Sequence, residues 1–512
     1  MKRALQLIVL LYAVLLSIPG MVQDISSSTW TQTQSSGWFT HGRNFQHTAS
    51  SSVPSQLLRR IHWQSQVDLH PEFTSGELFI HYGSPLVTPS NTVILPVRAE
   101  KQRFRIEARD GANGELIWDA TIGFRPAPAA FTPSYGPVLR KDGAVVFPEK
   151  GGVIGTREQA DHAEGEVQRL AFYGIDYYKA NKSVYDKYVM INTPLTSDGA
   201  GNVFFGFEVT GPTPGALKSG IARVSPEGKG IWVSAATASV DSNIQKLATN
   251  SAPALSCDGT SLYVVTNSSP FGFGYLLRLN TETLTTIGRV RLRDPSSGQD
   301  SIVPDISSST PMIGPDGDVY FGVWENPYPS HNGRGWLLHF NGALTKEKIP
   351  GSFGWDDTAS VVRASSVGSY SGKSEYLIVT KYNNYAGLGG DGVNKLAVLD
   401  PNASMRDPIL PVTRVMREVI TIASPTPDPN FPEFPGAVRE WCINTAAVDP
   451  FTNSVLANNE DGKLYRWDLM HNRFSETITL TAGIGEAYTP TLIGADGVVY
   501  AINDAIVFAV GY

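Results

Sequence analysis

The sequence predicts an all-β fold: an eight-bladed β-propeller closed by a strand from its own N-terminal part. Charged residues make up only 17% of the 512 positions, whereas Gly (49) and Pro (34) are abundant. This composition is typical of short strands joined by tight turns. The chain also repeats one unit along its length, and its last copy lacks a strand that an earlier segment can supply. Each of these features is taken in turn below.

The repeated unit is a small residue followed by Pro and aliphatic residues. Its clear copies begin at Ser84-Pro85, Gly136-Pro137, Thr193-Pro194, Ala252-Pro253, Thr310-Pro311 and Thr489-Pro490, and two degenerate copies begin at Ser365-Ser366 and Thr445-Ala446. Asp-Gly follows most copies and precedes a second apolar strand, which indicates a hairpin because Gly accepts the positive φ of a tight turn. The copies lie 44 to 80 residues apart. A four-stranded blade takes about 40–50 residues, so we expect eight blades, or seven if one degenerate copy is not a blade.

The ring needs a closing strand. After Pro490 there is room for three strands before Tyr512. We predict that residues 60–67 (RIHWQSQV) supply the fourth, because pairing the two ends of the chain removes two open sheet edges. Within a single propeller domain, 38–512, five prolines between 425 and 435 predict a surface insertion at about residues 411–440.

The first 20 residues predict a signal peptide. Lys2 and Arg3 precede an apolar run, residues 7–16, that is too short to span a bilayer. We therefore expect a secreted or periplasmic protein with a flexible leader at 21–37 and no membrane span after cleavage. Cleavage removes two basic and no acidic residues, so the formal charge falls from −7 to −9. That charge argues against a nucleic-acid partner, and we expect a monomer.

Two segments carry a family resemblance. Residues 108–118 (ARDGANGELIW) and 222–232 (ARVSPEGKGIW) resemble the tryptophan-docking motif of quinoprotein-type propellers, and residues 38–48 (WFTHGRNFQHT) resemble the entry segment of secreted proteins with these repeats. The chain thus resembles secreted PQQ-binding-like (quinoprotein alcohol dehydrogenase-like) β-propeller repeat proteins. The resemblance implies that Trp118 and Trp232 pack between neighbouring blades and that Gly114 and Gly228 form the turns before them.

The resemblance also raises the question of pyrroloquinoline quinone (PQQ) chemistry with Ca²⁺. The sequence has no vicinal cysteines, and we could match no Glu/Asn/Asp ligand set. Cys257 and Cys442 fall in blades far apart on the ring, so we expect two buried, unpaired thiols. We therefore predict no cofactor, no metal site and no catalytic residue.

Three functional hypotheses follow. The first is a non-catalytic binding or scaffold module for a protein, peptide or glycan. The second is a PQQ- and Ca²⁺-dependent oxidoreductase that uses the axial channel. The third is a carbohydrate-active lyase or hydrolase, for which the sequence offers no acid/base pair.

The candidate binding residues stand just before the pair of residues that begins each repeated unit, which we call the step. There the chain enters an inner strand at the mouth of the axial channel. They are His81, Tyr82, Tyr135, Asn192, Asn250, Ser308, Arg363, Asn444, Glu486 and Tyr488. Convergent polar groups in a concave place are the default binding hypothesis. The alternative is that they pair with one another or with channel water.

Overall fold

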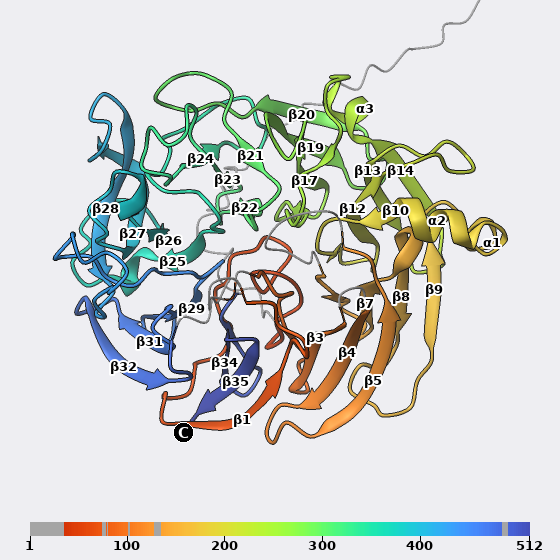
Figure 1. The fold of residues 1–512 in the computed structure, drawn as a ribbon, viewed down its shortest axis with the longest axis horizontal. Coiled ribbons are helices and arrows are strands. Elements are labelled where there is room, and N and C mark those ends of the chain that lie inside the picture. The colour runs from red at the N-terminus through yellow and green to blue at the C-terminus, as the bar shows by residue number, and fades with distance from the viewer. Residues whose placement is uncertain (1–34, 74–77, 79, 101–102, 127–134, 484–489) are drawn as a thin grey trace, which may run out of the picture. The chain divides into compact units, whose positions relative to one another are not determined.

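The computed structural model describes residues 35–512 except 74–77, 79, 101–102, 127–134 and 484–489. These residues form eight β-sheets arranged as blades around one axis, which confirms the predicted eight-bladed propeller (Figure 1). Residues 35–512 make one compact unit. The predicted signal peptide and most of the leader lie outside the described residues.

Blades 1 to 4 follow one another along the chain. Blade 1 is β2 (Leu86–Val87), β3 (Thr92–Glu100), β4 (Arg103–Asp110) and β5 (Leu116–Gly123). Blade 2 is β6 (Val138–Leu139), β7 (Val145–Pro148), β8 (Val153–Arg157) and β9 (Val167–Ala171). Blade 3 is β10 (Val189–Ile191), β11 (Thr196–Ser197), β12 (Val203–Val209), β13 (Gly220–Val224) and β14 (Gly230–Ser234). Blade 4 is β15 (Lys246–Leu247), β16 (Ala254–Leu255), β17 (Ser261–Asn267), β19 (Gly274–Asn280) and β20 (Thr286–Arg291).

Blades 5 to 8 complete the ring. Blade 5 is β22 (Met312–Ile313), β23 (Val319–Val323) and β24 (Trp336–Phe340). A small separate sheet pairs β18 (Phe271–Gly272), from the loop between β17 and β19 of blade 4, with β21 (Val303–Pro304), which lies between blades 4 and 5 in sequence. Blade 6 is β25 (Ser360–Arg363), β26 (Tyr376–Tyr382), β27 (Lys395–Arg406) and β28 (Arg414–Ala423). Blade 7 is β29 (Ala447–Asp449), β30 (Ser454–Asn458), β31 (Lys463–Asp468) and β32 (Arg473–Thr479). Blade 8 is β33 (Leu492–Ile493), β34 (Val499–Asn503), β35 (Ile506–Gly511) and β1 (Arg60–Gln66).

The helices are short and lie in connections. α1 (Ile175–Ala180) and α2 (Lys182–Tyr188) precede blade 3, and α3 (Ala235–Ser239) precedes blade 4. Short 3₁₀ turns span Lys150–Gly152, Ala364–Ser366 and Ala386–Leu388. Within the described part of the chain, we find no helix with both the length and the apolar character needed to cross a membrane.

Closure of the ring follows the predicted pairing. β1 runs antiparallel to β35, with Arg60 opposite Gly511 and Gln66 opposite Ile506. The two strands lie side by side at the rim of the ring, next to the C-terminus (Figure 1). Pairing satisfies backbone groups that would otherwise face solvent at two open edges.

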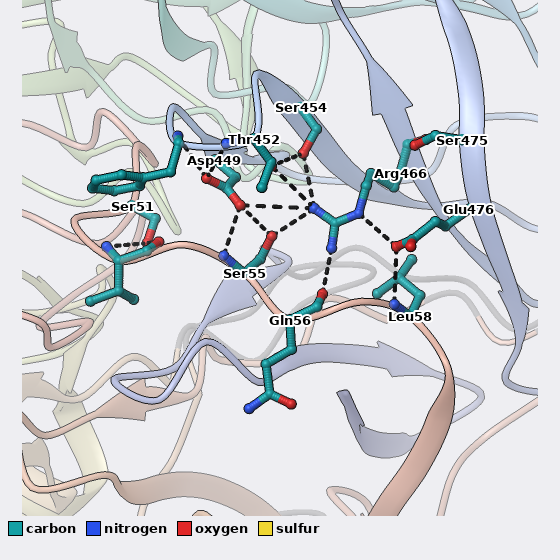
Figure 2. Close-up of polar contacts among 12 residues, drawn as sticks. Ser51, Ser55, Gln56, Leu58, Asp449, Thr452, Ser454, Arg466, Ser475 and Glu476 are labelled. Atoms are coloured by element: carbon teal, nitrogen blue, oxygen red, sulfur yellow. Dashed lines mark hydrogen bonds and ion pairs between the residues drawn. The ribbon is translucent and has the colours of Figure 1, made fainter. Parts of the chain in front are cut away.

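A buried arginine fastens the segment that leads into β1. Arg466 of β31 donates from Nη1 to Ser55 Oγ (2.7 Å), from Nη2 to the Gln56 carbonyl, and from Nε to Glu476 Oε2 (2.8 Å). The same Glu476 oxygen accepts the backbone N–H of Leu58 (3.0 Å). Figure 2 shows the guanidinium between these groups. Blade 7 therefore holds the chain immediately before the closing strand.

Three of the four predicted docking residues, Trp118, Gly114 and Gly228, contact a neighbouring blade. Trp118 Nε1 donates to the Ala160 carbonyl beyond β8 of blade 2 (2.7 Å). Gly114 takes a φ of +75°, and a Cβ there would lie 2.7 Å from the Trp63 ring of β1. Gly228 takes a φ of +81°, and a Cβ would lie 2.9 Å from Leu170 of β9. Trp232 is half-buried and meets Phe207 of its own blade edge to face. Each glycine is thus required both by its backbone conformation and by the closeness of the next blade.

Two boundaries differ from the sequence prediction, and both concern blade 6. The inner strand β25 begins at Ser360, so the Ser365-Ser366 step is a 3₁₀ turn rather than the strand entry. The step that matches the other blades is Thr358-Ala359, like Thr445-Ala446 of blade 7. The predicted insertion is also shorter, because residues 414–423 form the outer strand β28. The prolines occupy the connection after it, residues 424–446.

Candidate functional site

The entry segment, residues 37–49, is a coil that follows the inside of the ring. Trp38 exchanges backbone hydrogen bonds with Val87 of blade 1 (2.7 and 2.9 Å), and the Phe39 carbonyl accepts from Leu139 of blade 2 (2.8 Å). Thr40 Oγ1 donates to the Leu195 carbonyl of blade 3 (3.1 Å). The coil is the red segment near the centre of Figure 1.

The coil continues through the remaining blades in chain order. The carbonyls of Phe45, Gln46, Thr48 and Ala49 accept N–H groups from blades 4, 5, 6 and 7, with donors Leu255, Ile313, Val361 and Val448 at 2.7 to 2.9 Å. Each inner strand would otherwise expose unpaired backbone groups to the channel. The coil satisfies one such group in each of seven blades and so blocks the channel at its level.

Two buried histidines lie within this coil. The rings of His41 and His47 meet edge to face with centroids 5.7 Å apart, and His47 Nδ1 donates to the Pro311 carbonyl (2.8 Å). Burial lowers the pKa of His41 to about 3, with the charge of His47 as a second cause, and it lowers the pKa of His47 to about 4. Both rings are therefore neutral at pH 7.

An axial cavity of about 40 Å³ lies beside His41. A water molecule needs about 10–15 Å³ of such space, so the cavity has room for a few waters. Six of the ten predicted residues line it, namely His81, Tyr82, Tyr135, Asn250, Ser308 and Asn444, together with the repeat prolines Pro137, Pro194 and Pro490. The structure thus brings these side chains together from five different blades.

The other four predicted residues have different positions. Asn192 is buried next to the cavity, where its Nδ2 donates to the Leu247 carbonyl (2.9 Å) and its carbonyl accepts the Asn250 N–H (2.8 Å). Arg363 ends β25 as an exposed residue, paired in the sheet with Tyr376, so it does not line the cavity. Its assignment was wrong because the blade 6 step lies seven residues earlier than predicted. Glu486 and Tyr488 lie outside the described residues.

The position expected for Arg363 is taken by Asp356 and Asp357. Asp356 Oδ2 lies 3.2 Å from His81 Nε2, and its Oδ1 accepts the Ser308 N–H at 2.8 Å and the Ser308 hydroxyl at 2.5 Å. Asn444 Nδ2 donates to the same hydroxyl. Side chains from the entries to blades 1, 5, 6 and 7 are therefore connected across the axis. Burial raises the pKa of Asp356, but His81 and Lys381 outweigh it and leave the pKa below its usual value.

Asp357 is the second carboxyl at this place. Its Oδ2 accepts the hydroxyl of Thr380 (2.5 Å) and the N–H of Lys381 (3.2 Å). Burial raises its pKa to about 7, although the positive charge of Lys381 acts in the opposite direction. Asp356, Asp357 and Lys381 were not among the predicted residues. The signal for the two aspartates was the Thr358-Ala359 pair, which the Ser-Ser-Val match at 365–367 concealed, whereas Lys381 lies within β26 and had no such signal.

The two cysteines do not form a disulfide with each other, as expected. Cys442 is buried, but Cys257 is exposed, which corrects the expectation of two buried thiols. Cys442 Sγ donates to Glu460 Oε1 (3.3 Å) and lies 4.0 Å from Glu440 Oε2. Burial raises the pKa of Glu460. These three donors are the described His, Cys, Asp and Glu atoms close enough together to hold a metal ion.

PQQ does not fit the cavity described here. The cofactor is a flat tricyclic tricarboxylate, and ligand pockets generally measure about 300–1,000 Å³, whereas this cavity measures about 40 Å³. Asp356, whose carboxylate pairs with His81 at the cavity, would also place negative charge near the carboxylates of the cofactor. Some polar atoms of the site bind one another, through the connection His81–Asp356–Ser308–Asn444, whereas Tyr135 Oη and Asn444 Oδ1 have no hydrogen-bond partner among the described residues.

Comparison with known proteins agrees with the fold. No protein-family model and no curated protein matches the chain. Among solved structures, the quinohemoprotein alcohol dehydrogenase of Comamonas testosteroni is similar over 95% of this chain and 78% of that one, with 12% identity and a TM-score of 0.55. The quinohemoprotein alcohol dehydrogenase ADHIIG of Pseudomonas putida HK5 gives 94% and 76% coverage, 11% identity and a TM-score of 0.51.

A third similar structure, Sqt1 of Saccharomyces cerevisiae, covers 90% of this chain and all of that one, with 9% identity and a TM-score of 0.50. Structural similarity at identities this low shows a shared fold and leaves the chemistry open. The chain therefore has an eight-bladed β-propeller fold that is similar to the folds of these three proteins.

Proposed function

We propose that this protein is an exported, monomeric, non-catalytic binding propeller that meets its partner on one end of the ring. We call this end the loop face. Two kinds of segment lie at this end: the residues that lead into each inner strand, and the loops that connect the second and third strands of each blade. They share one end because successive strands of a blade run in opposite directions. The main loops there are 209–220, 267–274, 324–335 and 382–395, with the connection 424–446 beside them.

The observation that carries the proposal is the small size of the axial cavity. The coil of residues 37–49 and the cross-linked polar groups leave about 40 Å³ of space. A substrate or a large cofactor cannot enter such a space without moving the coil or breaking the His81–Asp356 bridge. The loop face, by contrast, offers long loops on a rigid scaffold, which is where propellers and similar folds place binding residues.

The test is a titration of the mature chain, residues 21–512, with PQQ and Ca²⁺. Binding is followed by calorimetry, and dye-linked oxidation of alcohols and sugars is measured in parallel. We expect no saturable binding and no turnover. Binding below about 10 μM with turnover would refute the proposal and establish the oxidoreductase hypothesis.

Export is tested separately by mass spectrometry of the protein recovered outside the cytoplasm. Loss of about the first 20 residues is the expected result. Recovery of the intact chain from the cytoplasm would contradict it.

A further inference from the structure

Four aromatic side chains gather on the loop face beside the channel mouth. We call them the aromatic platform: Phe271 on β18, Trp324 just after β23, Tyr328 in the following loop, and Trp355, which directly precedes Asp356. Trp324 stacks on Trp355 with centroids 4.1 Å apart, and Tyr328 meets Trp324 at 4.9 Å. Phe271 lies nearly parallel to Trp324, 14° between planes, with centroids 6.1 Å apart.

This arrangement leaves aromatic surface open to solvent. A centroid distance of 6.1 Å between nearly parallel rings means that they are offset, so each covers only part of the face of the other. Phe271 is 55% exposed and Tyr328 is 43% exposed, while Trp324 and Trp355 are half-buried behind them. Exposed rings that cluster beside a channel mouth are candidates for contact with a partner.

The backbone holds the platform in a fixed geometry. Residues 302–304 pair on one side with Phe271 and Gly272 and on the other with Trp324, through two hydrogen bonds between Ile302 and Trp324 (3.0 and 3.2 Å). The buried Glu325 accepts the N–H groups of His331, Gly333 and Gly335 at 3.3, 2.7 and 2.8 Å.

A second buried carboxylate fixes the same loop. Asp294 Oδ2 accepts the N–H of Asn326 and the indole N–H of Trp336, both at 2.9 Å. A platform fixed in advance loses little conformational entropy when a ligand binds.

The segments around the two exposed rings are polar and contain no charged residue. Phe271 stands in SSPFGF (268–273) and Tyr328 in NPYPSHNG (326–333), without Asp, Glu, Lys or Arg, and His331 is fully buried. The charged residues close by are occupied: Glu325 and Asp356, which follow Trp324 and Trp355, are buried, and Arg291, which packs over the Phe273 ring, pairs with Asp300. The two segments also carry hydroxyl groups close in sequence to the exposed rings, at Ser268, Ser269 and Ser330. This composition suits a ligand without net charge that carries many hydroxyl groups.

We propose that the aromatic platform binds a neutral carbohydrate chain, and this inference rests on the proposed binding function. The face of an aromatic ring is electronegative, and the axial C–H bonds of a pyranose present weakly positive hydrogens that stack on it. The hydroxyl groups of the two segments satisfy the sugar hydroxyls. An acidic glycan would need Arg or Lys partners, which these loops do not contain.

The test uses calorimetric titration with four neutral hexasaccharides, cellohexaose, laminarihexaose, mannohexaose and hexa-N-acetylchitohexaose, and with two comparison ligands. The comparison ligands are hexagalacturonate, which is acidic, and decaproline, which also stacks on aromatic grooves. We expect saturable binding of at least one neutral hexasaccharide and none of hexagalacturonate. Binding of decaproline alone would assign the platform to peptides and overturn the proposal.

Variants place the binding on the platform. In Phe271→Ala/Tyr328→Ala, affinity for the hexasaccharide should fall tenfold or more, because each lost ring removes stacking and apolar contact. The control Phe451→Ala/Tyr177→Ala removes a Phe that is 57% exposed and a Tyr that is 51% exposed elsewhere on the surface, and affinity should stay within twofold of wild type. Equal loss in both variants, or no binding of any neutral hexasaccharide, would refute the carbohydrate assignment. The PQQ titration decides the underlying binding function independently.

Discussion

Replacement of Arg466 by Met should weaken closure of the ring. Arg466 is 5% exposed, and its guanidinium contacts Ser55, Ser454, Glu476 and the Gln56 carbonyl. Removal of one partner of a buried charge pair costs about 3–5 kcal/mol. Glu476 keeps the Leu58 N–H, so its carboxylate is not left without a donor. We therefore expect the lower end of this range, about 3 kcal/mol.

Unfolding in guanidinium chloride, followed by tryptophan fluorescence, measures this loss of unfolding free energy, and calorimetry checks it. For a folded unit of residues 35–512, the entropy of unfolding is about 1 kcal/mol per kelvin, so the melting temperature should fall by about 3 °C. Hydrogen exchange should also speed up in β1, because Arg466 holds the chain just before it (Figure 2).

The control is Arg103→Met. Arg103 pairs with Glu100 at 3.2 Å, but both side chains are more than half exposed (58% and 60%), and such pairs contribute less than about 1 kcal/mol. A cycle with Glu476→Gln isolates the ion pair. The proposed role of Arg466 is wrong if the free energy of unfolding of Arg466→Met lies within about 1 kcal/mol of wild type. It is also wrong if Arg466→Met loses no more stability than Arg103→Met.

Three further predictions follow from single features. Gly114→Ala should cost about 1–2 kcal/mol more than Gly259→Ala, because both glycines have positive φ but only the Gly114 Cβ meets a neighbour, the Trp63 ring; equal losses in denaturant unfolding would contradict this. His41 and His47 take up protons on unfolding, since their folded pKa values of about 3 and 4 lie below the ordinary 6.5. The contribution of the two neutral histidines to the free energy of unfolding is therefore complete above pH 6.5. It is lost as the pH falls towards 4, by up to ~2.7 kcal/mol per pH unit for the pair. Asp357, with a raised pKa of about 7, acts in the opposite direction over that window, and His41→Asn should flatten the measured slope; an unchanged slope would disprove the assignment. A thiol reagent at pH 8 should modify one cysteine in the native protein and two after denaturation, and Cys257→Ser should abolish the native reaction; rapid modification of Cys442 would contradict its burial.

Much of the fold was predictable because each signal is local. The tight turns need a positive φ, and the Gly of each Asp-Gly pair marks such a position in the sequence. Gly143, for example, has a φ of +88° in the structure. The incomplete last repeat implied a closing strand, and residues 60–66 supply it. The entry of blade 6 was predicted seven residues too late because it has Ala359 where six of the other blades have Pro, so a nearby Ser-Ser-Val stretch matched the pattern better.

The candidate site was only partly predictable. Position in the repeat was sufficient to find His81, Ser308 and Asn444, because every blade presents its strand entry to the same axis. Their partner Asp356 was hidden by the register error. The aromatic platform had no repeat signal at all, since its rings come from loops whose lengths differ between blades.

The sequence by itself determined that this chain closes into a propeller and favoured eight blades over seven, because strand periodicity, turn residues and the missing strand are properties of neighbouring residues. The tertiary structure alone decided that the channel is blocked. That outcome depends on one coil, residues 37–49, binding an inner strand of seven blades in succession, and on charges from distant blades meeting at the axis. Contacts between residues hundreds of positions apart leave no local pattern, so they appear only when the ring is assembled.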